Sequence, residues 1–171
     1  NFAPPGTRKG PLSKLLRQLR LRWDDFALCP QIESSIVFPG HTLKFTNEFE
    51  YFEQQVHEVF PDQVENFSNL VKAIEDHDAL DLERKEVSGR GVVSSYITNP
   101  LLVEMLFCPL MFYGSASAHD MDFNQFVIMF NSIFREGFGR PYKGVRLILK
   151  KLVKQFRKFG GELKLRSGVQ S

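Results

Sequence analysis

The sequence has few or none of the features that would assign a function directly. It contains no GxGxxG dinucleotide motif, no P-loop, no GxSxG nucleophile motif, and no HExxH or CxxC metal signature. Its two cysteines, Cys29 and Cys108, are too few for a disulfide framework, so we expect two buried thiols in a reducing compartment. The four histidines are scattered and predict no zinc site. No self-sufficient active site is therefore expected.

Long apolar runs are also missing. The longest, residues 101–113, is interrupted by Glu104 and Pro109 and is shorter than the roughly 20 residues that cross a bilayer. Residues 1–11 are rich in proline, glycine and basic side chains, which predicts a flexible leader and not a secretory signal. Because the sequence does not begin with methionine, we expect an excised or processed piece of a larger protein. Because no secretory signal is present, we expect the protein in the cytoplasm.

One sign of charge is scarce in each part of the chain, although the net charge of the whole is only +2. Residues 1–22 carry six basic groups and no acidic group, residues 23–134 have a net charge of −13, and residues 135–171 have a net charge of +9. The basic ends fit peripheral contact with an anionic membrane surface, or simple solvation. A nucleic-acid partner is not expected, because no zinc-finger, helix-turn-helix or RNA-recognition signature accompanies the basic residues.

Phenylalanine is the abundant aromatic residue, with 17 copies against four Tyr and one Trp. Phe brings apolar area without a hydrogen-bonding group, so these residues predict a Phe-rich core. The alternative is that some of the rings, with neighbouring methionines, line a site for an apolar ligand. The candidates for such a lining are Met105, Met111, Phe112, Tyr113, Phe126, Met129 and Phe130.

The spacing of apolar residues predicts an α+β fold that is mainly helical, with a small antiparallel hairpin. We expect the hairpin at 35–45, helices at 12–21, 47–61, 62–74, from 99 onward, at 122–138 and at 143–159, and a polar connection at 75–91. Asn47 and Asp62 are the predicted N-caps of the second and third helices. Residues 12–171 are expected to form one domain, in which residues 162–169 form a strand without an obvious partner in this chain.

The last third of the chain carries a recognisable pattern. A Pro-Tyr-Lys-Gly loop leads into a helix with regular leucines, which is followed by a Gly-Gly pair and a segment that ends in valine. This order resembles the phytoene desaturase-like FAD-dependent oxidoreductases, a group within the flavin amine oxidase superfamily that includes carotenoid desaturases, carotenoid isomerases and retinol saturases. The residues that fit the pattern are Pro141, Gly144, Leu147, Leu152, Gly160, Gly161, Leu165 and Val169.

The resemblance extends over residues 10–171 and implies a middle, substrate-side segment of a larger flavoprotein, that is, a cap or substrate domain. In the family, the dinucleotide motif precedes the equivalent of this segment and further flavin-binding sequence follows it. FAD is therefore expected in the parent protein and not bound tightly to this segment alone. There, the flavin would abstract hydride or hydrogen from a long apolar, carotenoid- or retinoid-like substrate. The strand at 162–169 is expected to join the sheet of the flavin domain.

Two positions, Lys143 and Gly144, are implied by the resemblance to lie near the flavin. The family has glycine at both, because missing side chains allow close backbone approach, and Lys143 departs from that pattern. The parent protein is thus expected to be an oxidoreductase, whereas the isolated segment is expected to be inactive. The alternative is a non-catalytic helical module that binds an apolar ligand or an anionic membrane surface.

Overall fold

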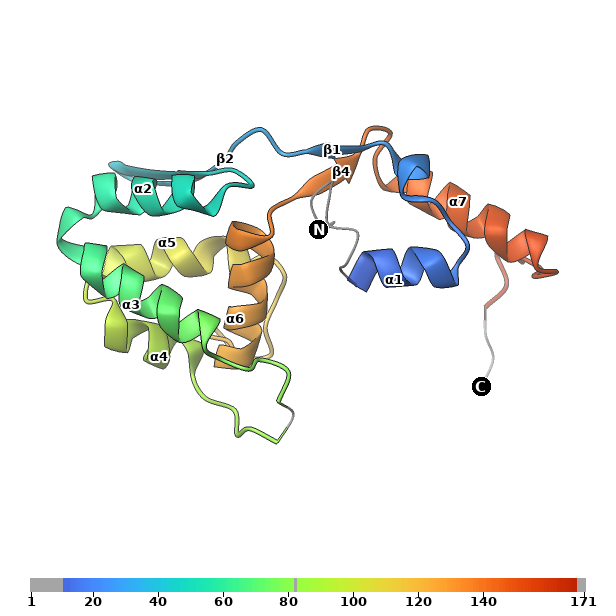
Figure 1. Cartoon of the computed structure of the whole chain (residues 1–171). Coiled ribbons are helices and arrows are strands. Elements are labelled where there is room, and N and C mark those ends of the chain that lie inside the picture. Colours follow the sequence, from blue (N-terminus) through green and yellow to red (C-terminus); the bar gives the residue numbers. More distant parts are fainter. Residues whose placement is uncertain (1–10, 82, 169–171) are drawn as a thin grey trace. The chain divides into compact units, whose positions relative to one another are not determined.

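The structure, a computed structural model, describes residues 11–81 and 83–168 and confirms the expected α+β, mainly helical class (Figure 1). It divides into two compact units, which we call unit 1 (Gln31–Phe138) and unit 2 (residues 11–30 with 139–168). Unit 1 contains β2 (Ser34–Phe38), β3 (His41–Phe45), α2 (Phe49–Val59), η2 (Pro61–Gln63), α3 (Val64–Glu75), α4 (Gly89–Tyr96), α5 (Pro100–Met111), α6 (Phe123–Phe130) and the π-helical η3 (Asn131–Arg135). Unit 2 contains α1 (Pro11–Gln18), η1 (Trp23–Phe26), β1 (Leu28–Pro30), β4 (Gly139–Pro141) and α7 (Val145–Lys158).

This division differs from the single domain predicted over residues 12–171. Burial explains the difference, because the buried core formed by the hairpin and helices of unit 1 is made only of residues from that unit. In the described part of unit 2, the buried apolar side chains are Leu16, Phe26 and Pro141. Charge follows the same division: unit 1 has six basic and 17 acidic side chains, a net of −11, and the described residues of unit 2 have 14 basic and three acidic, a net of +11.

The predicted hairpin is confirmed as the antiparallel pair β2 and β3. The turn uses Gly40 at φ +78°, a conformation that glycine adopts without strain. Ile36 lies opposite Leu43 in the register, and both side chains are buried. Val37, the next residue on β2, is exposed on the other face of the hairpin. The alternation of apolar and exposed residues thus sets which face of the hairpin covers the helices.

The core of unit 1 is rich in phenylalanine, as predicted. Phe52 and Phe134 are both fully buried and stack with ring centroids 4.2 Å apart. Phe67 meets Phe52 edge to face at 6.0 Å, and Phe45 meets Phe134 in the same way at 5.1 Å. Such pairs contribute about 0.5–1.5 kcal/mol beyond the area that they bury. The rings therefore serve mainly to join α2, α3, β3 and η3.

Neither Asn47 nor Asp62 caps a helix as predicted. Glu48 is the N-cap residue of α2, and Asp62 lies inside η2. The Asn47 side chain instead accepts from the Phe138 amide (2.7 Å) and donates to the Phe138 carbonyl (2.9 Å), so it joins the first part of unit 1 to its last residue. Gly137, at φ +77°, packs directly against Asn47 and has no room for a Cβ atom.

Helix α4 was not predicted, because its first turn contains Gly89 and Gly91, which lower helix propensity. Packing explains Gly89: a Cβ there would lie 2.7 Å from the Met121 carbonyl oxygen. The Ser88 hydroxyl caps the helix by accepting from the Gly91 amide at 2.8 Å. Part of the predicted polar connection at 75–91 is therefore the start of a helix.

Unit 2 contains a short antiparallel pair, β1 with β4, in which Cys29 lies opposite Arg140. Strands of three residues are too short to be recognised from the alternation of apolar and polar residues in the sequence. Cys29 is exposed, so the expectation that both thiols are buried was wrong for this one.

The strand expected over 162–169 is absent over 162–168, where no ladder partner satisfies the backbone, and Val169 lies outside the described residues. Among the described helices, none has the length and apolarity to cross a bilayer.

Candidate functional site

The turn before α7 holds the two residues implied to contact a flavin. The Gly144 amide donates to the Pro141 carbonyl oxygen at 2.7 Å, which closes a tight turn. Gly144 adopts φ +70° and ψ −170°, a conformation that strongly favours glycine. A Cβ added at Gly144 would meet no heavy atom within 4 Å. The backbone at this position is therefore open to close approach by another group.

Lys143 precedes Gly144 and is exposed. Its side chain stands where the family has glycine, so an approaching flavin has to accommodate an alkyl chain and a positive charge. The residues present thus fit a flavin in one respect, through Gly144, and depart from the family at the neighbouring position. The sequence contains no dinucleotide-binding motif that would hold the rest of such a cofactor.

The Gly-Gly pair after α7 has a local structural role. Gly160 adopts φ +84° and its amide donates to the Arg157 carbonyl at 3.0 Å. The Gly161 amide donates to the Phe156 carbonyl at 3.0 Å, and the Phe156 ring occupies the space that a Cβ of Gly161 would take. These bonds satisfy carbonyl groups at the helix end, as predicted for a glycine C-cap.

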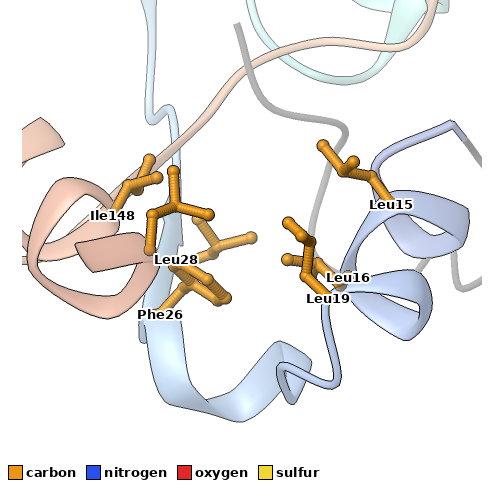
Figure 2. Close-up of a pocket in the computed structure, with 7 residues that line it drawn as sticks. Leu15, Leu16, Leu19, Phe26, Leu28 and Ile148 are labelled. Atoms are coloured by element: carbon orange, nitrogen blue, oxygen red, sulfur yellow. The ribbon is translucent and has the colours of Figure 1, made fainter. Parts of the chain in front are cut away.

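An apolar groove lies inside unit 2 between α1 and α7 (Figure 2). Leucine side chains of α1 face Phe26, Leu28 and Ile148 across it. The enclosed space is about 60 Å³, far below the roughly 300–1,000 Å³ of a ligand pocket. The lining residues, all apolar, are Leu15, Leu16, Leu19, Phe26, Leu28, Ile148 and Leu152. The groove is therefore a small gap in the packing of α1 against α7, and it is too small to bind a long substrate.

Two polar contacts hold α7 in unit 2. The Lys151 ammonium group lies 3.3 Å from the Asp25 carboxylate, and the Gln155 side-chain amide donates to the Leu19 carbonyl at 2.8 Å. A hydrogen bond from the Arg22 amide and the contact with Lys151 together hold the pKa of Asp25 below its ordinary value. Asp25 therefore remains ionised and paired across the neutral pH range.

The outward face of α7 is apolar and uncovered in the described structure. Val145, Leu149, Phe156 and Phe159 are each at least half exposed, and no residue of α7 is fully buried. Isolated exposed apolar residues are ordinary on protein surfaces, but four on one helical stripe form a continuous exposed apolar patch.

The seven residues predicted to line an apolar site divide into two groups. Met105, Phe126 and Phe130 have no exposed surface and pack in the core of unit 1. Met111 and Met129 are partly buried, while Phe112 is 84% and Tyr113 is 51% exposed. Helices α5 and α6 pack against each other, so this second group belongs to adjoining elements, at the C-terminal end of α5 and along α6. Three of the seven candidates are therefore core residues, and four reach toward the surface.

The connection after α3 contributes to a cavity that sequence reasoning did not find. This cavity, of about 330 Å³, is lined by His77, Arg84 and Lys85 together with residues near the start of α6. The only sequence signal was the Arg84-Lys85 pair inside an acidic segment, which solvation explains equally well.

The remaining reactive groups form no obvious catalytic set. In the part of the chain that the structure describes, no group of three or more His, Cys, Asp or Glu residues is placed to hold a metal ion. Burial, together with the charge of Glu104, raises the pKa of the Cys108 thiol, which keeps it protonated. A protonated thiol is a poor nucleophile.

Comparisons with known proteins add no relative: the scan against family models, the search of curated proteins and the search of solved structures each returned no match.

Proposed function

We propose that this chain is the substrate-side part of a FAD-dependent oxidoreductase similar to the phytoene desaturase-like enzymes, together with a turn and helix from the flavin side. The observation that carries the proposal is Gly144, which has a conformation suited to glycine and a backbone open on the side of its missing Cβ. The order of turn, helix and glycine cap around Pro141, Gly160 and Gly161 supports it. These are the positions that carry the family pattern.

The two units suit different tasks in such an enzyme. Unit 2 contains Lys143 and Gly144, and the uncovered apolar face of α7 suits a helix that packs inside a larger flavin-binding domain. Unit 1 is mainly helical and has a hydrophobic core of its own, which suits a separate substrate-side domain. Its exposed aromatic pair, Phe112 and Tyr113, offers an apolar surface to a long substrate.

FAD, when bound in the parent protein, would accept the hydride or hydrogen that the substrate loses. The residues of this chain would bind and orient the substrate and exclude water. Met111, Phe112, Tyr113 and Met129 are the surface candidates, whereas Met105, Phe126 and Phe130 would hold α5 and α6 in place behind them.

Anaerobic mixing of the parent protein with a long isoprenoid polyene tests this proposal. The expected result is reduction of the flavin, seen as loss of the oxidised flavin absorbance. Replacing Phe112 by Ser should lower kcat/KM about tenfold, since it removes most of one ring's apolar contact. Leu80→Ser, at a site that is also largely exposed (78%), is the matched control. An unreduced flavin with every polyene, or equal losses in both variants, would contradict the proposal.

A second candidate is an anionic membrane surface, favoured by the charge of unit 2. The described residues of this unit carry a net charge of +11. Val145, Leu149 and Phe156 of α7, with Phe159 directly after it, are exposed beside lysines and arginines of the helix. Basic amphipathic helices of this kind bind the interface of anionic bilayers.

Vesicle sedimentation tests the second candidate. The chain should pellet with phosphatidylserine-containing vesicles at low salt and be released as the salt concentration rises. Lys150→Glu combined with Lys154→Glu should weaken binding at least about thirtyfold, at about 1 kcal/mol for each lysine lost. Lys72→Glu in unit 1 should have no comparable effect. Equal pelleting with neutral phosphatidylcholine vesicles would contradict this candidate.

A further inference from the structure

A cavity in unit 1 lies where the connection after α3 meets the N-terminal end of α6. Its volume of about 330 Å³ lies within the range of small-molecule pockets, roughly 300–1,000 Å³. Most of the exposed wall is formed by carbon atoms, although five of the eight lining residues carry a polar or charged group. The lining residues are His77, Arg84, Lys85, Val87, Val92, Asp122, Phe123 and Asn124.

The hydrogen-bond acceptors at this cavity already have partners. The Asp122 carboxylate accepts from the backbone amides of Val87 (2.9 Å) and Asn124 (2.8 Å). Arg84 Nη1 lies 3.2 Å from His77 Nδ1, and a guanidinium group can only donate, so Nδ1 is the acceptor. His77 Nε2 therefore carries the proton and donates to Asn124 Oδ1 at 2.7 Å.

The donors are in excess. Within the described chain, the Lys85 ammonium group has no ion pair. Arg84 directs Nε to the Asp81 carboxylate at 3.3 Å and Nη1 to His77, which leaves the protons of Nη2 without a described acceptor. The Asn124 side-chain NH₂ group also meets no acceptor among the described residues. An apolar wall beside spare N–H donors suits a ligand with an apolar body and an acidic head.

The lining of the cavity is net positive, with Arg84 and Lys85 against Asp122, whose carboxylate already accepts from two backbone amides. Unit 1 carries only six basic side chains against 17 acidic ones, and two of the six, Arg84 and Lys85, lie at this one cavity. A carboxylate approaching this rim would make charge-assisted hydrogen bonds that are available at few other places on the unit.

We propose that this cavity binds a small apolar carboxylate, with its aromatic or branched body against Phe123 and Val92 and its carboxylate facing Lys85 and Arg84. This site involves no flavin and no residue of the substrate-side surface at Phe112. Its test is therefore independent of the function proposed above.

The direct test is titration of the ¹⁵N-labelled full chain with 1-naphthoate, followed by NMR. Saturable shifts are expected at the amides of Val87, Phe123 and Asn124. The neutral isostere 1-naphthamide should bind about tenfold or more weakly, because it offers no charge to Lys85 and Arg84. Absence of saturable shifts with 1-naphthoate, or equal affinity for the amide, would overturn the proposal.

Two substitutions sharpen this test. Lys85→Gln should weaken 1-naphthoate binding about tenfold, while the matched change Lys72→Gln on the exposed side of α3 should leave it unchanged. Val87 is half exposed, so Val87→Asp should preserve the fold while placing a repelling carboxylate at the wall and abolishing binding. Binding that survives Val87→Asp, or that weakens equally in Lys72→Gln, would also overturn the proposal.

Discussion

Asp120 links α4 to the segment before α6. It accepts from the Ser88 hydroxyl at 2.6 Å, from the Arg90 amide at 2.9 Å and from the Met121 amide at 2.8 Å. Partial burial alone would raise the pKa of Asp120, but these hydrogen bonds outweigh it and hold the pKa below the ordinary 3.8. A lowered pKa contributes stability above the ordinary value, and that stability is lost as pH falls through the lower pKa of the folded state.

Asp120→Asn should therefore reduce stability at neutral pH by about 1 kcal/mol, since the amide replaces a charged acceptor. It should also flatten the fall in stability below pH 3.8. Urea denaturation at several pH values measures both effects. Asp76→Asn is the control, because Asp76 is exposed and its carboxylate makes no described hydrogen bond. An unchanged acid-side slope in Asp120→Asn would show that these contacts do not control the pKa.

A comparison of Gly137 with Gly114 distinguishes the effect of backbone strain from the effect of a side-chain collision. Both have positive φ, +77° and +83°, but only Gly137 packs against Asn47, while a Cβ at Gly114 meets open space. Gly114→Ala should cost about 1 kcal/mol through strain alone. Gly137→Ala should cost about 3 kcal/mol, because Asn47 must also move and lose its bonds to Phe138. Equal losses of unfolding free energy in the two variants, measured by denaturant melts, would mean that Asn47 moves aside without loss of stability.

Asn47 also shows that the sequence predicts a residue's position in a helix pattern better than the partner of its side chain. A short polar residue ahead of an apolar stripe predicts a helix N-cap, and the structure has such caps at Asn99 and Asp122. At Asn47 the side chain bonds instead to Phe138, 91 residues away, a contact that no local pattern encodes. The buried Phe52 and Phe126 were predictable by type, but Phe112, of the same type, is exposed.

At the level of elements, the long periodic helices and the hairpin followed from apolar spacing, whereas short or irregular elements did not. Helix α4 has eight residues and two glycines, and β1 and β4 have three residues each. The π-helix η3 continues the stripe of α6 with a different period, which a search for 3.6-residue spacing reads as one helix. Of the candidate site, Gly144 and its turn were predictable from the motif, while the His77 cavity arises only from tertiary packing.

Burial predicts that the helices differ in local stability. Buried side chains of α2, α3, α5 and α6 belong to the core of unit 1, while α7 has no fully buried residue. Amide hydrogens of the first group should exchange at least about tenfold more slowly than those of α1 and α7, which open with little loss of buried area. Hydrogen exchange followed by NMR measures this directly. Equal protection in α7 and α5 would mean that another structure covers the apolar face of α7.

At the scale of the whole molecule, charge and packing divide the chain in the same way. The acidic unit 1 has its own core, and the basic unit 2 combines α1, η1 and β1 with β4 and α7 and contains a small apolar groove. The block charges were visible in the sequence, but their agreement with two packed units was not, because residues 12–171 were expected to form one domain. Long-range pairing of β1 with β4 is what brings the two basic segments into one unit.

The central claim is that the turn at Gly144 lies at a flavin in the parent protein. The most direct measurement is the FAD content of that protein, expressed from the complete reading frame, as wild type and as Gly144→Leu and Gly160→Leu. Both glycines have positive φ and open space at the Cβ position, so both changes strain the backbone without a side-chain collision. We expect stoichiometric FAD in the wild type, a clear loss in Gly144→Leu and little loss in Gly160→Leu. A wild-type protein that binds no FAD would contradict the account.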